Sequence, residues 1–304
     1  MKILLLFPMA DRQTGPAIKY AFEKLGHEVE GVDAKRMPLT SYSVACGFKP
    51  DLVFCSRTKE LTEQVAQIKR KFPNAIACVW NVDTRTDIND WHYLFELIKT
   101  CDYYFVVGWR TIPQWRMINR NTFWLPQGLQ SEIYDKPKEI TETDRVRYAC
   151  DVCWAGTRTG IHRGREVFLA IVEAMDVDFK QRGCLGIPRL YNEEHNKMAA
   201  LSRINLACSG WPENERYTSV RNYKLMGAGG FVLELERKGL HESFPLDTID
   251  CYKSPEDLAE KIRYWLAHDK ERKEIAERGY KWVHANATYT DRMRETLNQM
   301  GMKS

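Results

Sequence analysis

Continuous apolar runs and helically spaced apolar positions alternate along the chain. Runs typical of buried strands fall at residues 2–7, 28–33, 51–55, 75–80, 103–107 and 122–125. Between them, apolar side chains recur every three or four residues, the spacing of one helix face. These are Ile18, Ala21, Phe22 and Leu25 in one segment, and Leu61, Val65, Ile68 and Phe72 in another. Strands separated by helices of this length predict right-handed βαβ units and a parallel sheet.

The same alternation restarts in the second half of the chain. Strand-like runs at residues 149–155, 204–208, 231–234 and 249–252 accompany helical faces at 167–175 and 258–266. The polar stretch Asp135–Arg145, which contains Pro137, is expected to be a linker. The sequence therefore predicts an α/β protein with two successive domains, residues 1–140 and 141–285, and a cleft between them.

Length and charge fit this organisation. A chain of 304 residues corresponds to about two domains at ~150 residues each. With 44% hydrophobic and 28% charged residues, disorder is excluded. The net charge of 45 − 41 = +4 excludes a protein that binds nucleic acid mainly through a dense basic stripe.

Neither export nor metal binding is indicated. The opening apolar run, Ile3–Phe7, is too short for a signal peptide or a membrane span, so we expect a cytoplasmic protein. Most of the nine cysteines lie in apolar strand-like runs, as buried thiols do in a reducing compartment. Cys150 and Cys153 form a single CxxC with no second pair at zinc spacing, so no metal site is expected.

Ligands of open parallel sheets bind beyond the carboxyl ends of the strands, so the residues after each strand carry the candidate chemistry. The segment 156–165 leaves a strand and enters a helix, where glycines, backbone N–H groups and arginines favour an anion. The candidate diphosphate-binding residues are Gly156, Thr157, Arg158, Arg163 and Arg165. A solvated basic turn is the alternative. The segment is neither GxGxxG nor GxxxxGK(S/T), which disfavours a dinucleotide dehydrogenase or a P-loop NTPase.

A second candidate segment, 209–221, is a polar loop that follows a strand. It ends in Thr218 and Ser219, good N-caps for the next helix, whose N-terminus suits a phosphate. The ligand-binding candidates here are Tyr217, Ser219, Val220, Arg221 and Lys224. The alternative is an ordinary capped helix that stops at glycines 227, 229 and 230.

The third candidate is Asp83, just after a strand of the first domain. Its carboxylate could accept a proton from an acceptor hydroxyl, as a general base does, or could belong to an Asx turn that ends the strand. Asp11, in the loop after the first strand, is the rival carboxylate.

The order and spacing of these segments resemble the GT-B glycosyltransferases, in particular the "glycosyl transferases group 1" branch that includes CgeB-like proteins. The resemblance is strongest over about residues 150–290. It is carried by the Gly156-Thr157-Arg158 turn with Arg163-Gly164, by Ser219–Phe231, by 239–244 and 254–258, and by 271–272 and 276–279. In the first half it is limited to the strand and helix alternation and to Phe123–Gly128.

This resemblance implies two Rossmann-like, doubly wound domains that face each other across a cleft. A nucleotide-sugar donor, expected to be UDP-linked, is held mainly by the second domain and the acceptor by the first. Arg158 and Arg163 then bind the diphosphate, Ser219 and Val220 offer N–H groups to the distal phosphate, and Arg221 and Tyr223 flank the donor. Residues 286–304 are expected to cross back to the first domain as a helix. Such a hexosyl- or pentosyltransferase needs no metal or other cofactor, because positive charge stabilises the leaving diphosphate.

The chain departs from the family at one place. Many retaining members carry two glutamates eight positions apart, where this chain has Arg216 and Lys224. Either Glu213 or Glu215 substitutes, or the donor is unusual, and the stereochemical outcome stays open. A GT-A enzyme would need a metal-binding Asp-x-Asp; Asp176-Val177-Asp178 fits that pattern, but its place after a helix indicates a turn.

Other functions remain as alternatives. A nucleotide-sugar 2-epimerase and a non-catalytic sugar-nucleotide-binding protein share the architecture. The acceptor can be a polysaccharide, a protein or a hydroxylated base in phage-type DNA. The basic clusters Lys69–Lys71 and Arg110–Arg120 would suit DNA, or would be solvated helix faces. The host would then be a bacterial or phage-infected cell.

Overall fold

The computed structural model describes residues 1–158, 164–211 and 213–302. The chain folds into two compact units, unit 1 (Met1–Gln127 and Tyr289–Ser304) and unit 2 (Gly128–Thr288). Unit 2 thus begins at Gly128, earlier than the domain boundary at residue 140 that the polar stretch predicts. Residues 128–140 belong to unit 2 because Leu129 is buried there, against Gly227. Part of the predicted linker forms a helix, which Thr141 and Asp144 cap reciprocally.

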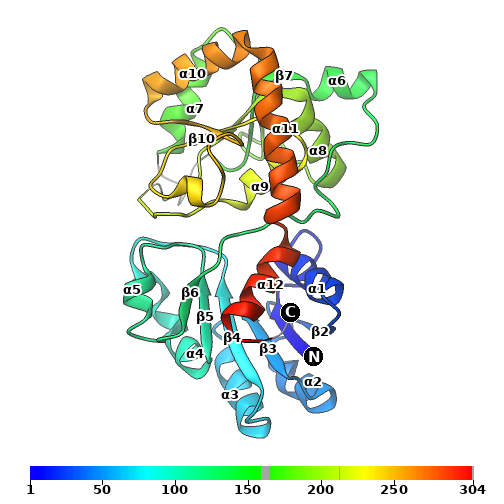
Figure 1. Cartoon of the computed structure of the whole chain (residues 1–304), viewed down its shortest axis with the longest axis vertical. Coiled ribbons are helices and arrows are strands. Elements are labelled where there is room, and N and C mark those ends of the chain that lie inside the picture. The colour runs from blue at the N-terminus through cyan, green and yellow to red at the C-terminus, as the bar shows by residue number, and fades with distance from the viewer. Residues whose placement is uncertain (159–163, 212, 303–304) are drawn as a thin grey trace. The chain divides into compact units, whose positions relative to one another are not determined.

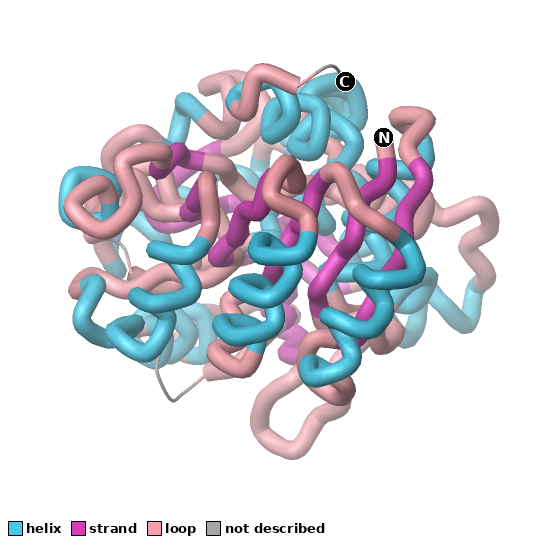
Figure 2. Tube along the Cα trace, turned by 90° about the horizontal axis from the view of Figure 1, so that it is seen from below, coloured by secondary structure: helices cyan, strands magenta, loops and turns pink. Residues whose placement is uncertain are grey.

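Unit 1 is built on a six-stranded parallel sheet in the order β2-β1-β3-β4-β5-β6. Its strands are β1 (Lys2–Phe7), β2 (Glu28–Asp33), β3 (Leu52–Ser56), β4 (Ile76–Asn81), β5 (Tyr103–Val106) and β6 (Thr122–Trp124). The helices are α1 (Thr14–Lys24), η1 (Pro38–Thr40), α2 (Ser41–Phe48), α3 (Leu61–Lys71), η2 (Ile88–Leu94), α4 (Phe95–Thr100), α5 (Ile112–Trp115) and α12 (Tyr289–Gln299). Figure 1 labels them, and Figure 2 shows helices lying against the strands.

Unit 2 is built on a five-stranded parallel sheet in the order β11-β10-β9-β7-β8. Its strands are β7 (Cys150–Ala155), β8 (Phe179–Arg182), β9 (Ser202–Ala207), β10 (Val232–Leu235) and β11 (Asp250–Tyr252). The helices are α6 (Glu142–Tyr148), α7 (Arg165–Glu173), α8 (Asn192–Leu201), α9 (Val220–Gly227), η3 (Leu240–Glu242), α10 (Pro255–Ala267) and α11 (Asp269–Asn286).

Both sheets confirm the α/β prediction, and strands such as β1, β3 and β4 are apolar, as expected of parallel sheets with helices on both faces. The side chains of Ile3–Leu6 in β1 have no exposed area. Cys150 and Cys153 are buried in β7 as free thiols, where Cys150 contacts Ser202 and Cys153 donates to the Asn205 side chain. No described helix combines the length and the apolar character needed to cross a membrane.

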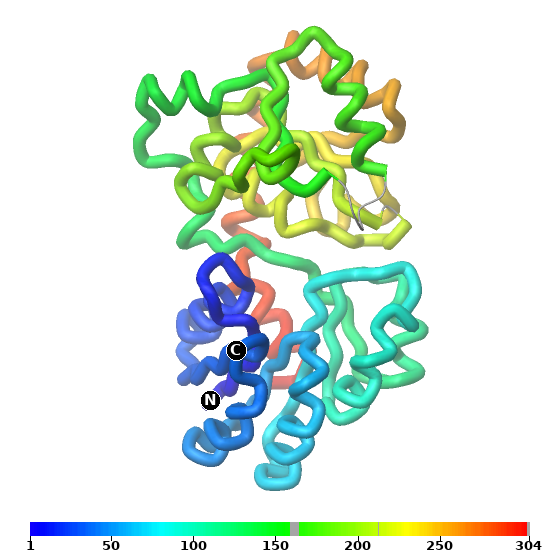
Figure 3. The backbone as a smooth tube through the Cα atoms, turned by 180° about the vertical axis from the view of Figure 1, so that it is seen from behind, coloured from blue at the N-terminus to red at the C-terminus, as the bar shows by residue number. Residues whose placement is uncertain are grey.

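The last helix, α12, completes unit 1. It lies beside α1, as Figures 1 and 3 show from opposite sides. Its Tyr289 donates a hydrogen bond of 3.1 Å to the Gln127 side chain, and Arg292 donates one of 2.9 Å to the Gln127 carbonyl. The Tyr289 ring also meets the edge of Trp80, 6.1 Å away between centroids. The end of the chain is thus tied to the last residue of the first segment of unit 1.

Each sheet reverses its winding at one point. In unit 1 the chain passes from β1 to β2 on one side and then to β3 on the other, so the reversal lies between β1 and β3. In unit 2 it lies between β7 and β9 for the same reason. The crevice beyond the carboxyl ends at such a point is where doubly wound sheets bind ligands.

Candidate functional site

Arg221 lies at the reversal point of unit 2. It comes from the first turn of α9, and its Nε donates a 2.7 Å hydrogen bond to the carbonyl of Ala155, the last residue of β7. Its guanidinium lies 4.3 Å from the ring centroid of Trp154. A Cβ on Gly156 would come within 2.2 Å of Nη2 of Arg221, so this position has to be glycine for the contact to form.

Arg165, the first residue of α7, occupies the neighbouring strand end. Its Nε donates a 2.8 Å hydrogen bond to the Cys208 carbonyl, just after β9. Its Nη1 donates to the carbonyl and the hydroxyl of Thr157, each at 3.2 Å. The guanidinium also lies 5.4 Å from the Trp154 ring centroid. The structure therefore brings together four of the predicted residues, Gly156, Thr157, Arg165 and Arg221.

The two guanidinium groups form a positively charged site in which neither is ion-paired with a described carboxylate, while the buried Glu234 carboxylate interacts with both electrostatically. Burial, together with the charge of Arg221, lowers the pKa of Arg165 to about 10, and burial lowers the pKa of Arg221. Neither side chain forms an ion pair within the described ranges, and the buried Nη1 of Arg221 has no hydrogen-bond partner there. Two desolvated like charges are costly unless an anion joins them, so this arrangement favours a bound anion.

The N-terminus of α9 adds backbone donors to the same end of the sheet. Ser219 caps the helix by accepting a 3.4 Å hydrogen bond from the Arg221 N–H. The first N–H groups of a helix have no partner within it, which suits a phosphate. Behind them, Thr218 and Tyr223 hydroxyls share a 2.9 Å hydrogen bond, and the Tyr217 ring lies 6.0 Å from the Arg237 guanidinium. Ser219, Val220 and Tyr217 thus stay predictions whose placement is compatible with a phosphate site.

A buried carboxylate that the sequence analysis missed holds this region together. Glu234 in β10 accepts hydrogen bonds from the Ser209 backbone and hydroxyl, both at 2.8 Å, and from the Asn222 side chain at 2.7 Å. It also forms a 3.1 Å ion pair with Arg237, in which both side chains have no exposed area. A charged residue inside the apolar run 231–235 is the signal that could have revealed it.

Arg158 lies in a different environment from the arginine pair. Both of its terminal nitrogens hydrogen-bond to the Glu173 carboxylate, and the Nη2–Oε2 distance is 2.8 Å. The guanidinium lowers the pKa of Glu173 to about 2. The positive charge of Arg158 is therefore paired with Glu173 of helix α7. Arg163, the other predicted diphosphate ligand, lies outside the described residues.

Of the two acidic residues expected to substitute for the missing glutamates, Glu215 is already ion-paired. Glu215 forms a 2.9 Å ion pair with Lys238, and Arg216 forms one of 2.7 Å with Glu242. Lys224, by contrast, is partly buried on α9, with its Nζ 4.4 Å from the Tyr134 ring centroid.

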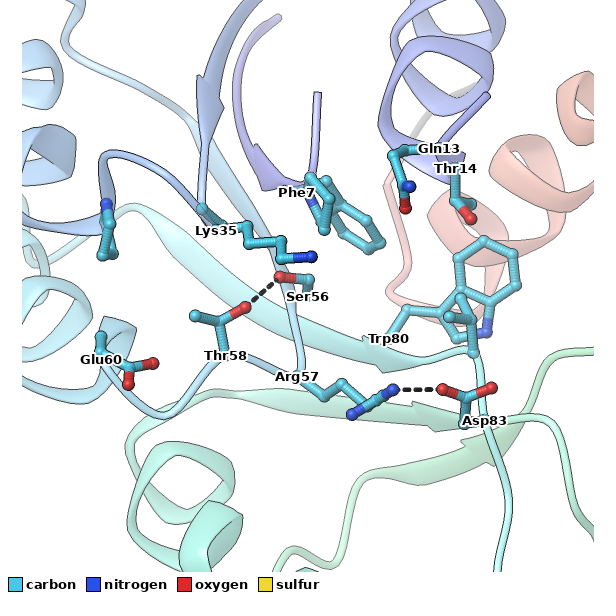
Figure 4. A pocket seen from close by; sticks show the side chains of 14 residues that line it. Phe7, Gln13, Thr14, Lys35, Ser56, Arg57, Thr58, Glu60, Trp80 and Asp83 are labelled. Carbon is cyan, nitrogen blue, oxygen red and sulfur yellow. Dashed lines mark hydrogen bonds and ion pairs between the residues drawn. The ribbon is translucent and has the colours of Figure 1, made fainter. Parts of the chain in front are cut away.

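Unit 1 has a pocket of about 590 Å³ at its own reversal point, within the range of ligand sites. It is formed by the carboxyl ends of β1 to β4 and the start of α1 (Figure 4). Its polar lining residues are Gln13, Thr14, Lys35, Ser56, Arg57, Thr58, Glu60 and Asp83. Within the described ranges, no group of three His, Cys, Asp or Glu side chains could hold a metal ion.

Asp83 lines this pocket, whereas Asp11 is exposed and does not. The Asp83 N–H donates a 3.2 Å hydrogen bond to the Asn81 side chain, so the predicted Asx turn is present and aims the Asp83 carboxylate at Arg57. Arg57 lies 4.9 Å from the ring centroid of Trp91. Asp83 thus belongs to the Asx turn and also presents its carboxylate to the pocket, so the two interpretations of this residue are not exclusive.

Comparison with known proteins adds independent information. Residues 163–298 match the family model described as "Glycosyl transferase-like". No curated protein sequence matches the chain significantly. Among solved structures, sucrose-phosphate synthase from Thermosynechococcus elongatus superposes with a TM-score of 0.70 at 12% identity, covering 99% of both chains. HepE from Anabaena, solved with UDP and glucose, gives a TM-score of 0.67 at 12% identity and 99% coverage of both chains. A glycosyltransferase from Rickettsia africae gives 0.67 at 13%, covering 98% of this chain and 97% of the other.

These likenesses and the two doubly wound units define the fold as GT-B. Within that class, residues 163–298, less than half of the chain, match the glycosyl transferase-like family model.

Proposed function

We propose that the protein transfers a sugar from a UDP-linked donor to an acceptor hydroxyl, and that the arginine pair of unit 2 binds the donor diphosphate. The observation that carries this proposal is the buried Nη1 of Arg221, which has no hydrogen-bond partner among the described residues, beside the Arg165 guanidinium. Anabaena HepE, of the same fold, has been solved with UDP-glucose, which supports the choice of donor.

The chemistry that follows is the stabilisation of a leaving group. Negative charge develops on the diphosphate as the bond between the sugar and phosphate breaks, and preorganised guanidinium and N–H donors stabilise it. In unit 1, Asp83 is proposed to accept the proton of the acceptor hydroxyl or to orient it. We further propose that transfer needs no metal ion, so that a chelator should leave turnover unchanged. The nine unpaired cysteines support action in a reducing compartment such as the cytoplasm.

The test is donor binding by Arg221→Met, which removes the charge but keeps an unbranched chain. Calorimetry with UDP-glucose should show a dissociation constant raised about 10- to 100-fold, the worth of a charged hydrogen bond. The matched control is Lys270→Met, which removes one positive charge from the exposed start of α11 and should bind normally. Equal binding by Arg221→Met and the native protein would contradict the assignment.

A further inference from the structure

A third cation of unit 2, Lys224, also has no ion pair with a described residue. Lys224 follows Arg221 by three residues on α9, so the two side chains leave the same face of the helix. The Lys224 ammonium forms neither a hydrogen bond nor an ion pair with any residue that the structure describes. Its Nζ lies over the Tyr134 ring, 4.4 Å from the centroid.

His195 packs against the same tyrosine. It lies on α8 with 7% of its surface exposed, and its ring meets the Tyr134 ring edge to face at 5.3 Å. Its Nδ1 is buried and has no hydrogen-bond partner in the described part of the chain. Burial, with the charges of Lys224 and Arg221 beside it, lowers the pKa of His195 to about 3, so the imidazole is neutral. Tyr134 therefore contacts both a cation and a buried neutral imidazole whose Nδ1 has no described partner.

A count of charges shows what this arrangement lacks. Arg165, Arg221 and Lys224 bring three positive charges, and none of them is paired with a described carboxylate. The buried acid nearby, Glu234, is already satisfied by Arg237 and by the Ser209 and Asn222 donors. The diphosphate of a nucleotide sugar brings two negative charges. With the diphosphate bound, one of the three cations therefore has no anion. The aromatic face of Tyr134 replaces only part of the hydration that a buried ammonium loses.

We propose that Lys224 and His195 form a second anion subsite on Tyr134, which recognises an acidic group of the donor in addition to its diphosphate. The proposal rests on the donor site proposed above and specifies the class of donor. A carboxylate on the transferred sugar and a phosphate on the nucleoside are two sources of the same chemistry. Lys224 is then the residue that selects an acidic donor over a neutral one.

The test compares three ligands by calorimetry: UDP-glucose, UDP-glucuronic acid, and UDP carrying a further phosphate on its ribose. The native protein should bind one of the two acidic ligands about 10- to 100-fold more tightly than UDP-glucose. Lys224→Met should abolish this preference, whereas Lys224→Arg, which keeps the charge, and the exposed control Lys270→Met should retain it. Which acidic ligand gains affinity identifies the source of the anion.

The outcomes separate this inference from the proposed function. If UDP-glucose binds and requires Arg221, but neither acidic ligand binds more tightly, only the subsite is wrong. The same holds if the preference survives in Lys224→Met. If no UDP ligand binds the native protein, both the donor site and the subsite are overturned. Thermal unfolding of each variant shows whether lost binding reflects lost folding.

Discussion

The absence of a side chain at Gly156 is as important to the anion site as the charged side chains are. Gly156 lets the Arg221 guanidinium lie against the backbone, between the Ala155 carbonyl and the Trp154 ring. A methyl group at this position would meet Nη2 at 2.2 Å. Since the end of an arginine side chain is flexible, we expect the guanidinium to move away and unit 2 to stay folded.

Gly156→Ala should therefore weaken UDP-glucose binding about tenfold or more while the thermal midpoint changes little. The matched control is Gly47→Ala in α2, where a Cβ would meet no atom within 4 Å. Isothermal calorimetry and thermal unfolding of both variants measure the two effects. A Gly156→Ala protein with native affinity would show that Arg221 does not need this position.

The lowered pKa of Lys224 predicts that the affinity for the donor depends on pH. Burial lowers its pKa to about 8, so Lys224 is charged at pH 7 and mostly neutral at pH 9. A donor that depends on this charge should bind more weakly as the pH rises through 8. His195 stays neutral throughout and adds no change, and the diphosphate of a nucleotide sugar does not titrate in this range.

The measurement is the dissociation constant between pH 7 and pH 9 for the native protein and for Lys224→Arg. Arginine keeps its charge over this range, so the variant should show a flat profile. Equal pH dependence in both proteins would assign the titration to another group.

At the scale of elements, Glu234 fixes α9 relative to the sheet. Its carboxylate joins the segment after β9 to Asn222 in the first turn of α9, and so sets where Arg221 and the helix N-terminus lie. Glu234→Gln would replace one acceptor oxygen with a donor that faces other donors. We expect this change to lower the free energy of unfolding by about 1–3 kcal/mol, measured by urea denaturation. The exposed Glu260→Gln in α10 should change it by less than about 0.5 kcal/mol.

The elements themselves were predictable because their signals are local. Apolar runs and helical spacing placed β1 and β2 at their observed bounds and the other predicted strands within two residues. The Glu234 network and the Tyr134 contacts were not predictable, because residues far apart in the sequence form them. The same reason explains Arg158: its neighbourhood suggested a phosphate ligand, but Glu173, fifteen residues later, binds it.

At the scale of the whole molecule, the two units are proposed to divide the work between donor and acceptor. Asp83 in unit 1 lines the pocket, whereas Asp11, its rival in the sequence, does not. Asp83→Asn should lower kcat at least about 100-fold, since the amide cannot take up the proton, while UDP-glucose binding stays unchanged. Asp11→Asn should leave both unchanged. Steady-state kinetics and calorimetry together test this division, and full turnover by Asp83→Asn would refute it.

Domain boundaries were harder to predict than elements. Polar composition pointed to residues 135–145, but composition reports solvent exposure, and this stretch is an exposed part of unit 2 that includes α6. The contacts that assign residues 128–134 to unit 2 involve buried partners such as Gly227, about a hundred positions away.

The return of α12 to unit 1 has a consequence for synthesis. The chain enters and leaves unit 2 at adjacent points, where the Leu129 N–H bonds to the Ala287 carbonyl at 2.8 Å, so unit 2 is an insertion between two pieces of unit 1. On the ribosome, every residue of unit 2 is made before α12 exists. The Met1–Gln127 part of unit 1 is therefore made with the α1 surface uncovered, until α12 emerges.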